Sequence, residues 1–325
     1  MLTFLIRKPE IPNPSPEDNN ENAVGLLFRD NVRTFHGDAG SHVTYLSSRF
    51  GDIKLSLSEP NNQDEHTLFA HHIWNSGIQM SEFISNANYE KSLHEDKRWN
   101  VEGEKVLELG SGTGIVGITA ALSGAAAVTL SDYPSSPVLR NLQHNVDTNI
   151  NPSTLPKVTI QGHEWGVLTD NFSTTHAGHF TRILCADCLW MDSEHYSLAR
   201  SIYHFLSPAE DARAWVIAGF HTGRAKIAAF FDICEQVGLR FHTEERLGGT
   251  VEGIWERDAD GEERRWCRER VDEERNRWMV IAILKRGDSV KVGGGEDGAK
   301  VEEKKKKQDD GYWASVFMQK GNRHT

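Results

Sequence analysis

Short apolar runs alternate with amphipathic segments through the middle of the chain. The apolar runs are bounded by glycine or charged residues and predict strands at 105–109, 126–131, 158–160, 182–186, 214–218 and 277–284. Segments with helical spacing of apolar residues lie between them, at 115–122, 137–146, 194–206 and 225–237. Strands separated by helices predict a mainly parallel, doubly wound α/β sheet with helices on both faces.

The two ends of this alternating region have a different pattern. No helix precedes the last strand, 277–284, so we expect that strand to run antiparallel to its neighbours. A weaker strand is expected at 240–246, and residues 247–276 have the composition of a charged loop. Upstream, partial alternation over 43–57 predicts a β-hairpin, and apolar residues at helical spacing predict a helix over 67–85.

Composition divides the chain into three parts. Residues 1–25 are rich in proline, asparagine and acids, and we expect them to be disordered. Residues 26–286 have core-forming composition and are expected to form one domain, with the hairpin and helix as its N-terminal extension. Residues 287–325 are a low-complexity charged tail, with the apolar segment Tyr312–Met318 near its end.

Charge and cysteine content exclude several classes of function. The 325 residues include 36 Lys and Arg against 47 Asp and Glu, a net charge of −11 that argues against nucleic acid and suits a cationic partner. No apolar run approaches the ~20 residues of a membrane-spanning helix. Four cysteines form no disulfide framework, so a reducing compartment fits. We expect a cytoplasmic monomer that binds neither nucleic acid nor a membrane.

A glycine-rich turn is the most informative stretch of the sequence. The segment Glu108-Leu-Gly-Ser-Gly-Thr-Gly-Ile-Val-Gly117 follows a strand and precedes a helix. Glycines there let backbone N–H groups approach a ligand, and the N-terminus of the helix favours anions. Asp132 ends the next strand, 22 residues after Gly110, where a carboxylate can bind both hydroxyls of a ribose.

The turn fits more than one ligand class. Its second half, Gly112-Thr-Gly-Ile-Val-Gly117, satisfies the dinucleotide pattern G-x-G-x-x-G. In that pattern the first glycine directly follows the strand, whereas here Glu108-Leu-Gly110 ends the strand first. This register favours the acid-x-G-x-G-x-G loop of S-adenosylmethionine enzymes. A dinucleotide site and a purely structural turn, with Asp132 as a strand cap, remain as alternatives.

Together with Ile73-Trp-Asn-Ser-Gly-Ile78, the turn resembles the seven-β-strand lysine methyltransferases of the methyltransferase-16 type, over residues 65–285. Within that group the chain is most similar to the nicotinamide N-methyltransferase-like branch, some of whose members methylate translation elongation factor 1-alpha. The resemblance implies a Rossmann-like fold with strand order 3-2-1-4-5-7-6. It also implies S-adenosyl-L-methionine as the cofactor and no metal.

The resemblance carries the family's cofactor residues onto positions of this chain. Trp74 matches the tryptophan that packs at the cofactor, Trp165 matches the one beside the adenine, and Ala186 matches the small residue after the fourth strand. The complete implied cofactor set is Trp74, Gly110, Ser111, Gly112, Gly114, Asp132, Trp165 and Ala186. Either tryptophan could instead be an ordinary core residue.

The acceptor side is expected at Asp187-Cys-Leu-Trp190, where the family has an acid followed three residues later by an aromatic, often Tyr. Asp187 ends a predicted strand, and parallel sheets place ligands at that edge. A carboxylate can orient an incoming amine, and an aromatic face can contact an ammonium. Asp187 and Trp190 are therefore the catalytic candidates, with helix capping by Asp187 as the alternative. Cys185 and Cys188 suit core packing better than metal binding.

These observations leave three hypotheses for function. The first is an S-adenosylmethionine-dependent N-methyltransferase that acts on a protein lysine or N-terminal amine, with elongation factor 1-alpha as the leading candidate substrate. The second is a small-molecule N-methyltransferase of the nicotinamide type. The third is a non-catalytic scaffold that binds the cofactor, which the intact glycine turn and Asp132 argue against.

Overall fold

The computed structural model describes residues 2–8, 34–60, 70–87, 98–153, 157–246, 249–271 and 276–287. These residues belong to one compact unit that ends at Gly287. The predicted charged tail lies outside them apart from Gly287, and so does the greater part of the segment predicted to be disordered. Within the described part of the chain, no helix combines the length and apolarity needed to cross a membrane.

The central sheet follows the predicted order. Its strands are β6 (Lys105–Leu109), β7 (Ala127–Asp132), β8 (Lys157–Gly162), β9 (Arg182–Ala186), β10 (Arg213–Gly219), β11 (Leu239–Phe241), β14 (Ile254–Asp258), β15 (Glu263–Arg265) and β16 (Trp278–Arg286). Strands β8, β7, β6, β9 and β10 are parallel neighbours in that order. Strand β16 then pairs antiparallel with β10, and β11 pairs with β16. The predicted order 3-2-1-4-5-7-6 and the antiparallel last strand are confirmed.

The prediction of a charged loop over residues 247–276 is wrong. The described part of that segment contains β13 (Gly249–Glu252), which pairs with β12 (Thr243–Arg246), and also β14 and β15, which extend the main sheet. Both β11 and β14 pair with the edge of β16 that faces away from β10. Strand β11 pairs with the end of β16, and β14 pairs with its beginning. The main sheet therefore has nine strands among the described residues instead of the predicted seven.

A buried carboxylate explains why this segment is ordered despite its charge. Glu256 of β14 is fully buried and accepts hydrogen bonds from the side chains of Arg224, Arg264 and Arg270. Arg224 also lies over the ring of Phe220, with 4.1 Å between the guanidinium carbon and the ring centroid. Because the charges pair with one another inside the fold, a polar composition here does not indicate a solvated loop.

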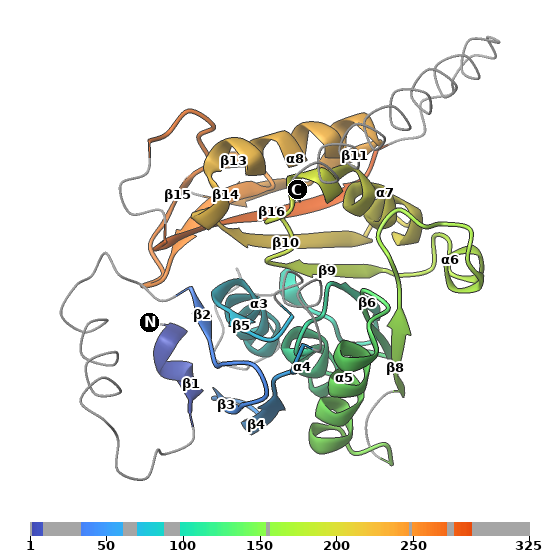
Figure 1. Ribbon diagram of the computed structural model, residues 1–325. Helices are drawn as coiled ribbons and strands as arrows, with labels where there is room; N and C mark the ends of the chain where they lie inside the picture. The colour runs from blue at the N-terminus through green and yellow to red at the C-terminus, as the bar shows by residue number, and fades with distance from the viewer. Residues whose placement is uncertain are drawn as a thin grey trace, which may run out of the picture. The chain divides into compact units, whose positions relative to one another are not determined.

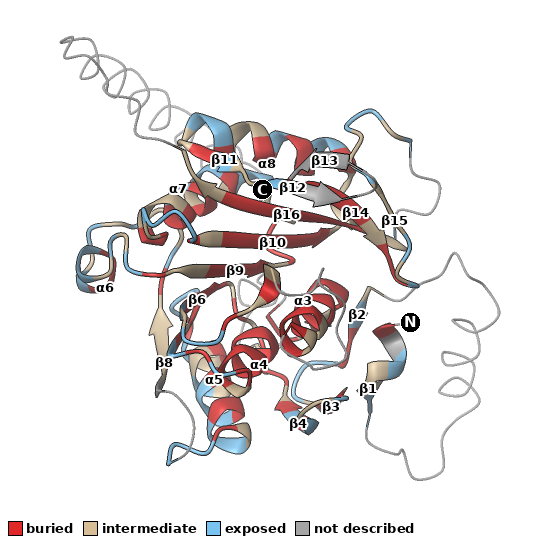
Figure 2. Cartoon of the chain, turned by 180° about the vertical axis from the view of Figure 1, so that it is seen from behind, coloured by how far each residue is buried: buried red, intermediate tan, exposed pale blue. Residues whose placement is uncertain are grey.

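Helices cover both faces of the sheet (Figure 1). On one face lie α3 (Asn75–Asn86), α4 (Ile115–Leu122) and α5 (Ser136–Asn149); on the other lie α7 (His195–Phe205) and α8 (Arg224–Gln236). Successive strand residues alternate between two cores, so Val106 packs on the first side and Leu107 on the second. Figure 2 shows β10 and β16 buried along most of their length, as expected for strands in a sheet that has helices on both faces.

The N-terminal region forms a second, smaller sheet. The predicted hairpin is confirmed as β3 (His42–Ser47) and β4 (Gly51–Ser56). Strand β1 (Ile6–Arg7) pairs with β3 and follows the short 3₁₀-helix η1 (Leu2–Leu5). Residues 2–8 therefore depart from the expected disorder, because Leu2 is buried in the core and the following strand gains a partner.

The predicted helix over 67–85 begins later than expected. The predicted range includes Ile73 and Trp74, but these form the short strand β5, which pairs with β2 (Phe35–His36). The backbone N–H of Asn75 donates to the carbonyl of Thr34, so the helix starts at Asn75 instead. Residues 67–69 of the prediction lie outside the described residues.

Three asparagines of α5 attach the hairpin to the main domain. Asn141, Asn145 and Asn149 lie four residues apart and bond to the backbone of β4 at Ser56 or Lys54. Asn145 is fully buried: its Oδ1 accepts from the N–H of Ser56, and its Nδ2 donates to the carbonyls of Ser56 and of Thr113 in the glycine turn. This one amide therefore links the hairpin, α5 and the turn.

We predict that Asn145→Leu lowers the free energy of unfolding by about 2–4 kcal/mol, because three hydrogen bonds to the backbone of Ser56 and Thr113 are lost in a buried site. Urea denaturation measures the loss. The matched control is Gln143→Leu on the exposed side of the same helix, which should change stability by no more than about 0.5 kcal/mol. Equal stabilities of the two variants would contradict this account of the hairpin.

Candidate active site

The glycine turn connects β6 to α4 through alternating left-handed residues. Gly110, Gly112 and Gly114 have φ values of 70°, 52° and 78°, a region that other residues rarely adopt. Gly114 is the residue at which α4 begins. The predicted strand–turn–helix arrangement is confirmed, and each of these glycines is required by the backbone itself.

Two glycines also make room for neighbouring side chains. A Cβ on Gly110 would lie 2.9 Å from Sγ of Cys188 and 3.1 Å from the indole of Trp165. A Cβ on Gly117 would lie 1.9 Å from Leu130, so a larger residue would force α4 away from β7. The glycine turn therefore packs closely against the segments that contain Trp165 and Cys188.

Two buried carboxylates lie beside the turn, and each accepts a glycine N–H. Asp132 Oδ2 is 2.7 Å from the nitrogen of Gly112, and its Oδ1 accepts from the N–H of Tyr133. Glu108 Oε2 accepts from the N–H of Gly117 at 3.0 Å. Burial raises the pKa of Asp132 to about 6 and that of Glu108 to about 8, although these hydrogen bonds oppose the increase.

A cavity of about 260 Å³ lies at the carboxyl edge of the sheet, next to the turn. Nine of the ten predicted site residues line it: Trp74, Gly110, Ser111, Gly112, Asp132, Trp165, Ala186, Asp187 and Trp190. Gly114 does not belong to the lining, because its place at the start of α4 faces Leu142 and Leu130. The structure therefore brings nine of the ten predicted residues to one cavity and places Gly114 at the N-cap of α4, outside the lining.

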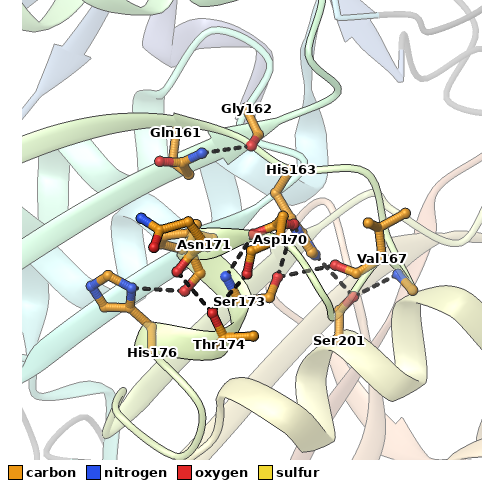
Figure 3. Close-up of polar contacts among 12 residues, drawn as sticks. Gln161, Gly162, His163, Val167, Asp170, Asn171, Ser173, Thr174, His176 and Ser201 are labelled. Carbon is orange, nitrogen blue, oxygen red and sulfur yellow. Dashed lines mark hydrogen bonds and ion pairs between the residues drawn. The ribbon is translucent and has the colours of Figure 1, made fainter.

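A polar network holds the turn that carries Trp165 (Figure 3). The buried hydroxyl of Ser201 on α7 accepts from the N–H of Gly166 and lies 3.1 Å from Nε2 of His163. The side chain of Asp170 accepts from the N–H of Ser173 and so caps the short helix α6 (Asn171–Thr175). Ser173 Oγ in turn donates to the carbonyl of Val167. These bonds fix both ends of the loop on which the indole is placed.

Asp187 occupies a strained position at the end of β9. Its φ of 59° makes it the only residue other than glycine with a positive φ among those described. The residue is 7% exposed, its N–H donates to Ile217, and its Oδ1 accepts from the N–H of Gly219 at 3.2 Å. Burial raises its pKa, while nearby His221 and the hydrogen bonds from Gly219 and Ser76 oppose that increase. The alternative that Asp187 caps the helix near Glu194 is wrong, because its carboxylate accepts from the N–H of Gly219 at the end of β10 and the N-cap of α7 is Glu194.

Aromatic rings surround Trp74 at the same end of the cavity. The indole stacks on the imidazole of His221, with 5.3 Å between ring centroids and 24° between planes. Phe35 of β2 and His72 also contact it, at centroid distances of 5.4 Å and 6.1 Å. Trp74 therefore lines the cavity and is not an ordinary core residue. The pairing of β2 with β5 fixes its position.

The thiols of Cys185 and Cys188 are buried, as predicted from their place at the end of a strand. Cys188 Sγ donates to the carbonyl of Leu109 at 3.2 Å, which ties the acceptor segment to β6. Burial is the main cause that raises the pKa of both thiols. Both groups are therefore neutral thiols near pH 7, a state that suits packing better than nucleophilic chemistry.

Comparison with known proteins agrees with this geometry. The family model described as lysine methyltransferase matches residues 54–237, more than half of the chain. The chain belongs to the lysine methyltransferase family. The matched segment includes the glycine turn and every predicted site residue.

Relatives of this lysine methyltransferase include two fungal proteins. The "Protein N-terminal and lysine N-methyltransferase efm7" of Schizosaccharomyces pombe is 30% identical over 58% of this chain and 70% of the relative. The "Protein N-terminal and lysine N-methyltransferase EFM7" of Gibberella zeae is 29% identical over 52% of this chain and 66% of its own length, just under two thirds. A SAM-dependent methyltransferase from Aquifex aeolicus has a TM-score of 0.38 at 14% identity, over 58% of this chain and 86% of that one.

The cofactor of this lysine methyltransferase is S-adenosylmethionine, and the residues of the cavity fit it. A buried carboxylate at Asp132, with two of its lone pairs occupied by N–H groups, keeps further lone pairs for the hydroxyls of a ribose. The indole of Trp165 packs against Gly110 and offers a face to a purine. Because the chain belongs to the lysine methyltransferase family, the dinucleotide alternative is rejected.

Some residues of the site escaped sequence reasoning. His163 and Glu194 line the cavity, and His221 lies beside Asp187 although no spacing in the sequence connects them. Their positions after predicted strands could have indicated two of these residues, because His163 follows β8 and His221 follows β10. Residues just after parallel strands meet at one edge of a sheet.

We predict that Asp132→Ala weakens the binding of S-adenosylhomocysteine by about 1–3 kcal/mol at pH 7.5, because ribose hydroxyls lose a charged acceptor. With its pKa at about 6, Asp132 loses its charge as the pH falls, so wild-type affinity should drop roughly fourfold between pH 7.5 and 5.5. Titration calorimetry measures both effects.

The control for this experiment is Asp147→Ala, an exposed acid on α5, which should keep wild-type affinity at both pH values. In Asp132→Ala the pH dependence over this range should disappear, since Glu108, with a pKa of about 8, stays mostly protonated throughout. Unchanged affinity in Asp132→Ala would remove this residue from the cofactor site.

Proposed function

We propose that this lysine methyltransferase methylates the N-terminal α-amine and a lysine side chain of a protein, with elongation factor 1-alpha as the leading candidate. The names of the fungal relatives support both kinds of acceptor amine. The net charge of −11 supports a basic protein partner, because long-range attraction favours opposite charge. We also propose that the enzyme acts as a cytoplasmic monomer and binds neither nucleic acid nor a membrane.

The observation that carries this proposal is the position of Asp187. Its buried carboxylate lines the same cavity as the cofactor residues, and Trp74 and Trp190 lie in the same lining. A backbone in the left-handed region costs free energy in a residue other than glycine, and such strain is kept at functional sites. A carboxylate with indole faces near it matches an ammonium group, which pairs with the charge and contacts the rings.

The chemistry requires an amine with a free lone pair. An α-amine has a pKa near 7.7–8.0 and a lysine amine near 10.4, so both reach the site largely as ammonium ions. Asp187 binds the ammonium and takes up its proton, and the nitrogen lone pair freed in this way attacks the methyl group. The cofactor supplies an electrophilic methyl group, and the protein contributes mainly alignment and the placement of charge.

The direct test uses the purified full chain, methyl-labelled S-adenosylmethionine and three acceptors. These are elongation factor 1-alpha with a free N-terminus, the same protein with an acetylated N-terminus, and nicotinamide. We expect label on the first, less label on the second and none on nicotinamide, with the modified residues located by mass spectrometry. Methylation of nicotinamide with none of the protein would favour the small-molecule function. No transfer to any acceptor, with intact cofactor binding, would favour the scaffold.

We predict that Asp187→Asn lowers kcat on the protein acceptor roughly 100-fold and leaves cofactor affinity within about threefold, because the amide cannot bind or deprotonate an ammonium. The matched control is Asp192→Asn, an exposed acid five residues on that pairs with Lys226. The control should keep wild-type turnover. Equal losses of turnover and cofactor affinity in Asp187→Asn would assign Asp187 to the cofactor site instead.

A further inference from the structure

The carboxylate of Asp187 faces an imidazole on the side where β10 ends. His221 belongs to the 3₁₀-helix η4 (Phe220–Thr222), and its Nε2 lies 3.8 Å from Asp187 Oδ1. The same oxygen accepts the N–H of Gly219. The two side chains are 21% and 5% exposed, so water screens their interaction only weakly.

The surroundings of the imidazole indicate which nitrogen carries its proton. His221 Nδ1 is buried and has no hydrogen-bond partner among the described residues. With the hydrogen on Nδ1, a buried N–H would lack an acceptor and the Nε2 lone pair would face a carboxylate, so the neutral ring keeps its hydrogen on Nε2. That hydrogen points toward the carboxylate in both the neutral and the protonated ring.

We propose that His221 is the positioning residue of the acceptor site: its Nε2–H faces one oxygen of the Asp187 carboxylate across 3.8 Å, favours the ionised carboxylate by electrostatic attraction and leaves the other oxygen for the incoming amine. This inference rests on the proposed function and extends it. Without His221, the hydrogen bond from the N–H of Gly219 would still stabilise the buried charge, but the electrostatic contribution of the imidazole would be lost. Protonated Asp187 would no longer attract an ammonium.

Two neighbours hold the imidazole in place. The ring stacks on Trp74, which itself lines the cavity. Gly219 provides the space, because a Cβ there would lie 2.8 Å from His221 Nδ1. Since φ at Gly219 is −75°, space for the ring rather than backbone conformation explains glycine at this position. The same residue thus donates to Asp187 and makes room for its partner.

Other titratable groups near Asp187 and His221 are either neutral or paired with other residues. Cys188, next to Asp187 in sequence, is a buried thiol whose pKa is raised by burial, so it stays neutral. Arg277 lines a small cavity together with Asp187 and His221, but its guanidinium pairs with Asp258 and Asp260. Arg224, at the start of α8, pairs with Glu256. His221 is therefore the group that faces the Asp187 carboxylate at ion-pair distance.

The experiment measures how an acceptor peptide binds as a function of pH. The probe is the N-terminal peptide of elongation factor 1-alpha with a free α-amine, titrated into the full chain saturated with S-adenosylhomocysteine. Between pH 5 and 7 the amine stays protonated, so a change in affinity reports the enzyme. In the wild-type chain, affinity should fall as the pH drops and Asp187 takes up a proton.

Replacing His221 should move that fall to higher pH. His221→Phe keeps a ring to stack on Trp74 but removes the donor, and we expect its midpoint to rise by about one pH unit. His221→Gln restores a donor, so its midpoint should lie between those of the wild type and His221→Phe. Gly219→Ala, which displaces the ring, should move the midpoint in the same direction. The control is His144→Gln, an exposed imidazole on α5, whose midpoint should match wild type.

The outcomes separate this inference from the proposed function. An unmoved midpoint in His221→Phe, even with weaker binding at every pH, would mean that the ring acts by packing alone and would overturn the inference. No binding of the peptide to the wild-type chain at any pH, together with no methylation of the protein, would overturn the proposed function and this inference with it.

Discussion

Buried carboxylates at one edge of the sheet set the main physical constraint on this molecule. Glu108, Asp132 and Asp187 follow or end parallel strands, and each accepts a hydrogen bond from a glycine N–H, at Gly117, Gly112 and Gly219 respectively. Burying a carboxylate is unfavourable unless donors replace water. Glycine serves here because its backbone can approach closely without a side chain in the way.

The rest of the fold keeps these donors in place. Asn145 connects the glycine turn to the N-terminal hairpin, and the pairing of β2 with β5 fixes Trp74 at the acceptor side. Behind η4, the pairing of Arg224 with Glu256 supports Phe220, the residue next to His221. Segments that look peripheral in the sequence therefore act on the site, because they determine where its carboxylates and rings lie.

Much of the fold and the site could be predicted from the sequence because the signals are local. Five parallel strands show as short apolar runs, and the glycine turn combines a strand, left-handed residues and a helix start within ten positions. Nine of the ten predicted site residues follow from that turn and from the family resemblance. Strands β14 and β15 could not be predicted, because the burial of Glu256 depends on Arg224, Arg264 and Arg270, which lie 8 to 32 residues away from it in the sequence. His221 was missed for the same reason: its role depends on contact with Asp187, 34 residues away.

The central claim is that one cavity holds the cofactor on Asp132 and presents the acceptor amine to Asp187. The most direct measurement is a crystal structure of the full chain with S-adenosylhomocysteine. The account predicts the ribose hydroxyls on Asp132, the adenine against Trp165, and the sulfur on the side of the cavity that Asp187 lines. A ribose bound to another carboxylate, or a sulfur directed away from Asp187, would contradict it.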